Sequence, residues 1–118
     1  MTLTNDFSLI DADRCRQHGW RSTQNFYFTQ NDTVVPLLVA ELGRALPFYP
    51  LAFKQLNQNV YQLVALLGLH PGRNLFVDAN GQWRVNYIPS PYRAHPFALM
   101  KVQMDNGNSQ YMIGFDRR

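Results

Sequence analysis

A chain of 118 residues with a net charge of +3 is long enough to bury one sizeable core and short enough to form a single domain. Hydrophobic residues make up 46% of the chain and charged residues 16%, a balance that excludes an intrinsically disordered composition. The single cysteine, Cys15, excludes an intrachain disulfide framework and cannot build a zinc site by itself.

The sequence carries no sign of secretion or of a membrane span. Its first residues, "MTLTNDFSLIDADRC", have no basic head followed by an apolar stretch, and the longest apolar run, "LVALLGL", is far below the roughly 20 residues that a span needs. We therefore expect a cytoplasmic protein. The cations are scattered, and the densest group, Arg14, Arg16 and Arg21, is too weak a patch to predict nucleic-acid binding.

The first half of the chain predicts one principal helix. Residues 1–24 are polar and are expected to form a solvated N-terminal arm, and the aromatic run at residues 26–28 predicts a short strand. The helix is predicted over residues 36–46, because Pro36 suits a first helical turn and Pro47 ends the pattern.

The second half predicts β-hairpins. The segments "LAFKQL" and "YQLVALLGL" flank a polar loop at residues 57–59, which is typical of two paired strands. Asn80-Gly81 predicts a second hairpin, since both central residues of a type I′ turn need positive φ. One face of its return strand should then carry Trp83, Val85 and Tyr87.

Three prolines, Pro89, Pro91 and Pro96, exclude a central strand in "IPSPYRAHP" and predict a structured crossing there. Asn106-Gly107 then predicts a final hairpin between "FALMKVQM" and "SQYMIGF".

These elements together predict an α+β fold, in which one antiparallel sheet or partly closed barrel is built from hairpins and packed against one principal helix. The core is expected to draw on apolar residues from every element: Phe28, Leu38, Leu42, Phe53, Leu63, Ala65, Leu67, Phe76, Trp83, Val85, Phe97, Leu99 and Ile113.

Several segments in a fixed order resemble the SapC family, bacterial proteins named for an association with surface-layer protein systems. They are a helix with Glu41, a Tyr49-Pro50 exit, "LLGL", "NLFVD", "GQW" and the Tyr-Arg-x-x-Pro-Phe block at residues 92–97. Family members tend to carry a second arginine in that block, where this chain has Ala94.

The resemblance implies a single SapC-like domain over residues 1–118. Because family members are usually longer, it also implies an N-terminal half or a minimal version of the family pattern. The function it implies is that of a non-enzymatic accessory protein, which acts through protein contacts and is linked to a bacterial surface-protein system.

No group of residues predicts catalysis, a metal or a cofactor. The three histidines are far apart in sequence, and Cys15 with His18 lacks the orienting group and oxyanion site that a nucleophilic cysteine needs. The absence of a catalytic set favours a non-enzymatic protein, so we expect no catalytic residues, no metal ligands and no cofactor.

One polar cluster offers an alternative function. It is a notch for a small anionic or carbohydrate ligand, in a binding domain or an enzyme, because guanidinium groups bind planar anions and stack on rings. Its residues would be Arg73, Asn74, Tyr92, Arg93 and His95. The competing interpretation, which we favour, is that Arg93 pairs with Asp78 or Glu41 and that the prolines only fix a turn.

The end of the chain predicts a contact surface. The strand containing "YMIGF" is expected to lie at an unpaired edge, where self-association or a protein partner would add a strand. The predicted contact residues are Tyr111, Met112, Ile113 and Phe115.

Overall fold

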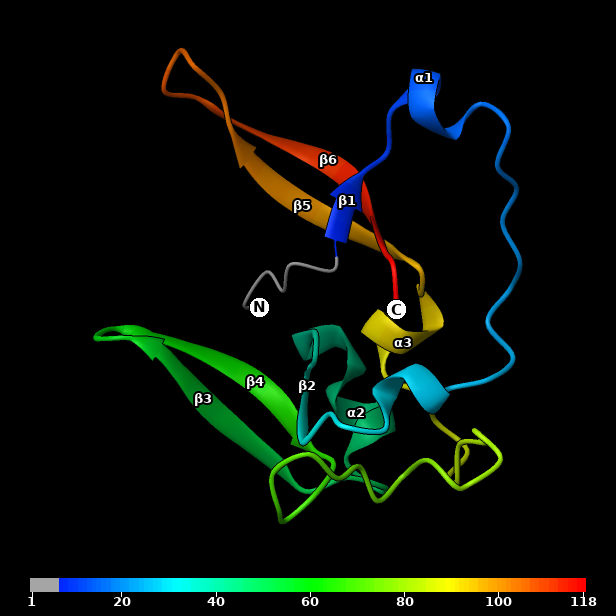
Figure 1. Cartoon of the computed structure of the whole chain (residues 1–118). Helices are drawn as coiled ribbons and strands as arrows, with labels where there is room; N and C mark the ends of the chain where they lie inside the picture. The colour runs from blue at the N-terminus through cyan, green and yellow to red at the C-terminus, as the bar shows by residue number, and fades with distance from the viewer. Residues whose placement is uncertain (1–6) are drawn as a thin grey trace. The chain divides into compact units, whose positions relative to one another are not determined.

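The computed structural model describes residues 7–118, which divide into two compact units (Figure 1). One unit is Gln24–Arg93, and the other combines the described part of Met1–Thr23 with Ala94–Arg118. Each unit contains one open, three-stranded antiparallel sheet. The predicted α+β class is confirmed, with two open sheets in place of one sheet or a partly closed barrel.

The sheet of the Gln24–Arg93 unit has the order β2-β4-β3, with β2 at Val34–Pro36, β3 at Leu51–Asn57 and β4 at Val60–Leu66. The predicted hairpin around residues 57–59 is confirmed, since β3 and β4 pair antiparallel from Leu51↔Ala65 to Asn57↔Val60. The register of this pair shifts between Gln55 and Asn57, so the outer end of β3 is irregular.

The core of this unit combines the inner half of that sheet with a cluster of aromatic rings. Val35 and Ala65 lie opposite each other in the sheet and are buried, as is Leu67 just beyond β4. Trp83 packs against this core, with its ring 5.7 Å from that of Phe26 and 5.5 Å from that of Tyr92. The predicted inward side of Trp83 is therefore confirmed.

The predicted helix over residues 36–46 is shorter than expected. Pro36 ends β2, and the backbone stays extended through Leu38, because the N–H of Leu37 still donates to Leu63 O at 2.9 Å. The helical part consists of a 3-10 turn, η2, at Val39–Glu41 and the helix α2 at Leu42–Ala45.

The strand predicted at residues 26–28 is wrong. A 3-10 turn, η1, occupies Tyr27–Thr29, because the side chain of Asn25 accepts a hydrogen bond from the N–H of Tyr27 and starts a turn. Thr29 is fully buried within this turn and donates its hydroxyl to Phe26 O.

The Asn80-Gly81 turn forms, with φ of +78° at Gly81, but the two strands predicted around it do not. The flanking segments share only the isolated bridge Val77↔Trp83. Asp78 explains the short ladder, since its carboxylate accepts hydrogen bonds from the N–H groups of Asn80 and Gln82, both at 2.9 Å.

The segment rich in prolines forms a crossing, as predicted, and contains the short helix α3 at Ser90–Arg93. The peptide bond between His95 and Pro96 is cis.

In the other unit, the sheet order is β1-β6-β5, with β1 at Phe7–Leu9, β5 at Phe97–Gln103 and β6 at Ser109–Asp116. The predicted hairpin at Asn106-Gly107 is confirmed: β5 pairs over its whole length with residues 109–115 of β6, and Gly107 has a φ of +83°. The expected N-terminal arm thus includes a strand, followed by the helix α1 at Ala12–Cys15.

The prediction that the last strand lies at an edge of its sheet is wrong. β6 is the central strand, because β1 pairs with its last part, from Leu9↔Gly114 to Phe7↔Asp116. The strand that occupies the edge expected to be free is β1, from an earlier part of the same chain.

The predicted core is only partly confirmed. Ala65 and Leu67 are buried, and Phe28, Leu63, Phe76, Trp83 and Val85 pack against the core. The prediction is wrong for five residues that are exposed: Leu38, Leu42, Phe53, Leu99 and Ile113. Phe53 lies opposite Leu63 in the β3–β4 hairpin and is 72% exposed, while Leu99 and Ile113 lie opposite each other on an exposed face of the second sheet.

Leu67 and Leu69 are close in sequence but differ in how far their side chains are exposed. Leu67 is 1% exposed and Leu69 is 84% exposed, so Leu67→Ala should lower the free energy of unfolding by about 2–5 kcal/mol and Leu69→Ala by less than about 0.5 kcal/mol. Urea unfolding of both variants measures the difference. Equal losses would contradict the position of Leu67 in the core.

Candidate functional site

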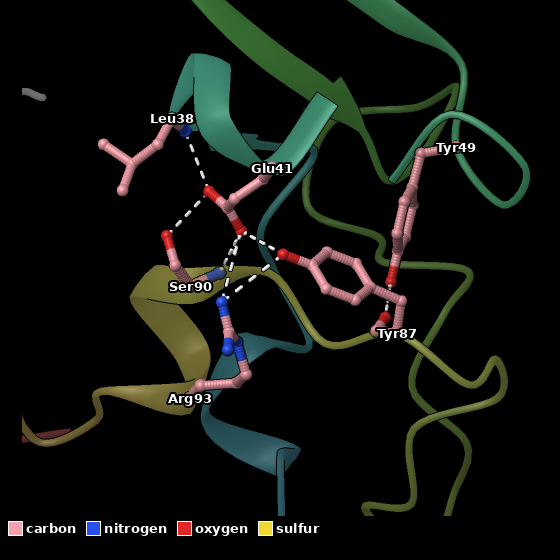
Figure 2. A network of polar contacts seen from close by, with 6 residues as sticks. All are labelled: Leu38, Glu41, Tyr49, Tyr87, Ser90 and Arg93. Carbon is pink, nitrogen blue, oxygen red and sulfur yellow. Dashed lines mark hydrogen bonds and ion pairs between the residues drawn. The ribbon is translucent and has the colours of Figure 1, made fainter. Parts of the chain in front are cut away.

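The side chain of Glu41 points into the Gln24–Arg93 unit, where it is 5% exposed (Figure 2). Its Oε1 accepts hydrogen bonds from the hydroxyl of Tyr87 at 2.6 Å and the N–H of Ser90 at 2.8 Å. Its Oε2 accepts from the hydroxyl of Ser90 at 2.7 Å and the N–H of Leu38 at 2.8 Å. One carboxylate therefore joins the start of η2 to the start of α3.

This hydrogen bonding keeps Glu41 ionised. Burial by itself raises the pKa of a carboxyl group, but the bonds from Tyr87, Leu38 and Ser90 together outweigh burial and leave the pKa of Glu41 below its ordinary value of 4.5. Arg93 adds a cation, with Nη2 3.7 Å from Oε1 of Glu41 and its guanidinium carbon 5.4 Å from the centre of the Tyr87 ring. The favoured prediction that Arg93 pairs with Asp78 or Glu41 is confirmed for Glu41.

The network continues into the aromatic core through Tyr49. Its hydroxyl donates to the backbone oxygen of Tyr87 (Figure 2). The same hydroxyl accepts the N–H of the Trp83 indole at 2.8 Å. Burial, which opposes the phenolate, raises the pKa of Tyr49 to about 12, so the hydroxyl stays protonated and available as a donor. The three residues Glu41, Tyr87 and Tyr49 connect the surface at Arg93 with the ring of Trp83.

The η2–α2 segment and its flanking residues present their large aliphatic side chains outward. Glu41, Ala45 and Tyr49, spaced four residues apart, are buried. The intervening side chains form an exposed surface that we name the apolar stripe: Leu38 at 63%, Val39 at 78%, Leu42 at 39% and Leu46 at 63% exposure. Figure 2 shows the side chain of Leu38 pointing away from the carboxylate that its own N–H contacts.

The residues of the predicted ligand notch take different positions within the Gln24–Arg93 unit. Arg73 is exposed, whereas Asn74 is buried and its amide donates to the backbone oxygen and the hydroxyl of Thr29, both at 3.1 Å. Tyr92 is buried and donates its hydroxyl to Asp32 at 2.6 Å. Asn74 and Tyr92 thus use their polar side-chain atoms within the fold, as Arg93 does with Glu41.

The fifth predicted residue, His95, belongs to the other unit. Its Nδ1 lies 3.8 Å from Oδ2 of the buried Asp116, which also accepts a hydrogen bond from Nε of Arg118 at 2.8 Å. Burial lowers the pKa of His95 below its ordinary value of 6.5, because the attraction of Asp116 is smaller than burial together with the repulsion of Arg118.

The residues of the predicted partner surface lie on both faces of the second sheet. Tyr111 and Ile113 are 63% and 55% exposed and share one face with Phe115, which is half-buried. Met112 lies on the opposite face, since neighbouring residues of a strand point to opposite sides.

A spacing pattern in the sequence also fits the apolar stripe, although the predicted core assigned Leu38 and Leu42 to the interior. Leucines recur every four residues at 38, 42 and 46, and so do the buried residues at 41, 45 and 49. Each set suits one face of a helix. The set that faces inward is the one whose Glu41 accepts hydrogen bonds from Leu38, Tyr87 and Ser90. No local pattern places Tyr87 and Ser90 beside Glu41, because 46 and 49 residues separate them in sequence.

A family model, SapC, matches residues 10–118, which is nearly the whole chain. The chain belongs to the SapC family. No curated protein and no solved structure matches it significantly. The SapC match spans both units, so the Glu41 network, the apolar stripe and the β5–β6 hairpin all lie within the matched residues, whereas β1 precedes them.

Two further observations concern residues 7–118 of this SapC protein. No helix in this part of the chain is long and apolar enough to cross a membrane. No group of three or more His, Cys, Asp or Glu side chains in it is placed to hold a metal ion.

Replacing the buried carboxylate tests the network. Glu41→Gln leaves one acceptor oxygen for donors that now use two, so it should lower the free energy of unfolding by about 1.5–3 kcal/mol at pH 7, as measured by urea denaturation. Ser90→Ala removes only the hydroxyl donor and should cost about 1 kcal/mol.

The difference in the free energy of unfolding between wild type and Glu41→Gln should also depend on pH. We call this difference the stability gap. A carboxyl group whose folded pKa is lowered stabilises the fold fully above its unfolded pKa, near 4.5, and loses this contribution as pH falls through the folded value. The stability gap should therefore become smaller below pH 4.5. A stability gap that stays constant down to pH 3 would contradict an ionised Glu41.

The lowered pKa of His95 predicts a second dependence of stability on pH. The unfolded chain binds the proton more readily than the folded one, so wild type should lose stability as pH falls from above 6.5 through the folded pKa of His95. His95→Gln should remove this part of the slope. Urea midpoints measured from pH 8 to pH 5 test it, and parallel curves for the two proteins would contradict it.

Proposed function

We propose that this SapC protein is a non-enzymatic accessory protein that binds a protein partner, in a pathway linked to bacterial surface proteins. Membership of the SapC family supports the setting. The observation that carries the proposal is the apolar stripe, which holds four large aliphatic side chains in water on one short segment. On the composition of the sequence, we place this activity in the cytoplasm.

The stripe has the character of a binding surface. Exposed apolar side chains that occur singly need no explanation, but a contiguous group is typical of a protein interface. Burying this group in a complex would gain roughly 25 cal/mol for each Å² of apolar surface removed from water. Gly43 and Ala40, exposed between the larger side chains, would let a partner approach the backbone closely.

Charge restricts the partner further. Arg44 is the only exposed charged residue between Leu38 and Phe48, because Glu41 points inward. A partner with an apolar surface and a carboxylate at its rim would complement the stripe.

The stripe departs from the usual pattern of a surface helix. An apolar residue at position 41 and polar residues at positions 38, 42 and 46 would be the usual pattern for a surface helix. The chain has the reverse arrangement, with the carboxylate inside and the leucines outside. Such departures from the ordinary pattern are typical of functional positions.

Paired variants test the proposal. The double variant Val39→Ser with Leu46→Ser removes two exposed members of the stripe, and Leu69→Ser changes an exposed leucine outside it. Pull-downs from cells that express the chain should recover a reproducible protein with wild type and with Leu69→Ser, and lose it with the double variant.

Circular dichroism should show that both variants keep the wild-type fold, because the substituted side chains are exposed. A partner that binds the double variant as well as wild type, or no reproducible partner at all, would refute the proposal.

A further inference from the structure

β5 is an edge strand of the second sheet, and its pairing is unusually regular. All seven of its residues pair in register with β6, from Phe97↔Phe115 to Gln103↔Ser109, without a bulge. Within residues 7–118 no other strand pairs with its outer side. The strand contains no proline. The N–H of Phe97 donates to Ala94 O at 2.8 Å, and beyond this residue the outer edge presents a regular row of backbone donors and acceptors.

The other sheet edges of the described chain are blunted. β1 and β2 have three residues each, and β2 ends in Pro36. β3 is as long as β5, but the register shift between Gln55 and Asn57 interrupts it. Long, regular edges invite the addition of a strand, and β5 is the one edge here with both properties.

An exposed apolar surface lies next to this edge, on the face of the sheet that carries the odd-numbered residues of β5 and β6. Leu99 is 69% exposed and lies directly opposite Ile113, which is 55% exposed. Tyr111, 63% exposed, lies opposite Lys101. A strand added to β5 would cover part of this surface as well as the backbone edge.

We infer that the added strand is β5 of a second copy of the chain, paired antiparallel about Met100 to form one continuous six-stranded sheet. A twofold axis perpendicular to the sheet keeps the same face outward in both copies, so the two Leu99 and Ile113 surfaces become continuous. The interface uses the same residues from both copies.

The side chains of β5 select this register. Pairing about Met100 sets all seven residues of each strand opposite a residue of the other, and it places Lys101 of each copy opposite Leu99 of the other. Pairing about Lys101 would set two like charges directly opposite each other and shorten the ladder. Pairing about Leu99 avoids this repulsion but also leaves part of each strand unpaired.

This interface lies in a different unit from the apolar stripe, so it goes beyond the proposed function. A monomeric chain that still loses its partner on substitution of the stripe would refute the dimer and leave the proposed function intact.

Two substitutions of opposite charge at Leu99 test the register. Both remove the same exposed side chain, but Leu99→Lys sets a cation opposite Lys101 of the other copy, twice in each dimer, whereas Leu99→Glu sets a carboxylate there. Sedimentation over a concentration series should give a wild-type dimer, and a dissociation constant about tenfold higher for Leu99→Lys than for Leu99→Glu. Adding Lys101→Glu to Leu99→Lys should restore the dimer.

Cross-linking gives an independent test in a Cys15→Ser background, which removes the only native cysteine. Met100→Cys places two thiols opposite each other, about 4.5–5.5 Å apart at the Cα atoms and within disulfide range. Val102→Cys is the matched control, because its two copies would be offset by about 13 Å along the strand.

Mild oxidation should link Met100→Cys and leave Val102→Cys monomeric on a non-reducing gel. A wild-type protein that stays monomeric at high concentration, equal dissociation constants for the two Leu99 variants, or equal cross-linking of the two cysteine variants would each overturn the inference.

Discussion

The buried carboxylate of Glu41 sets the orientation of the η2–α2 segment. An ionised group in the interior costs several kcal/mol unless hydrogen bonds replace its water. Here both oxygens are satisfied, by donors from Leu38, Tyr87 and Ser90. Turning the segment by one residue would bury a leucine but would leave those donors without an acceptor, so the network keeps the carboxylate inside and the leucines outside.

The same constraint connects fold and function. The network uses two segments distant in sequence, around Glu41 and around Ser90, so the apolar stripe is presented only when the Gln24–Arg93 unit has folded. A partner that binds the stripe would then recognise the folded chain and not an unfolded one. The exposed position of Arg93, which pairs with Glu41 and lies over the Tyr87 ring, leaves the network open to solvent on that side.

Local signals in the sequence predicted the elements that local chemistry decides. The turns at Asn80-Gly81 and Asn106-Gly107 form with positive φ at both glycines, and the β3–β4 hairpin forms around its polar loop. The pairing of β1 with β6 was not predictable in this way, because it joins the two ends of the described chain. The strand predicted at residues 26–28 failed for a local reason, since one Asn side chain at position 25 favours a turn over an aromatic strand.

The site was less predictable than the fold, because its decisive contacts are long-range. Charge reduced the partners of Arg93 to Asp78 or Glu41, and the structure shows Glu41. Nothing in the sequence opposed Leu38 or Leu42 as core residues. Helical spacing identifies two candidate faces here and cannot rank them. Only the number of donors available to a carboxylate on each face decides, and that number depends on a segment nearly 50 residues away. In this segment the buried carboxylate of Glu41 has hydrogen-bond donors in the interior, and the leucines on the other face of the segment are therefore exposed.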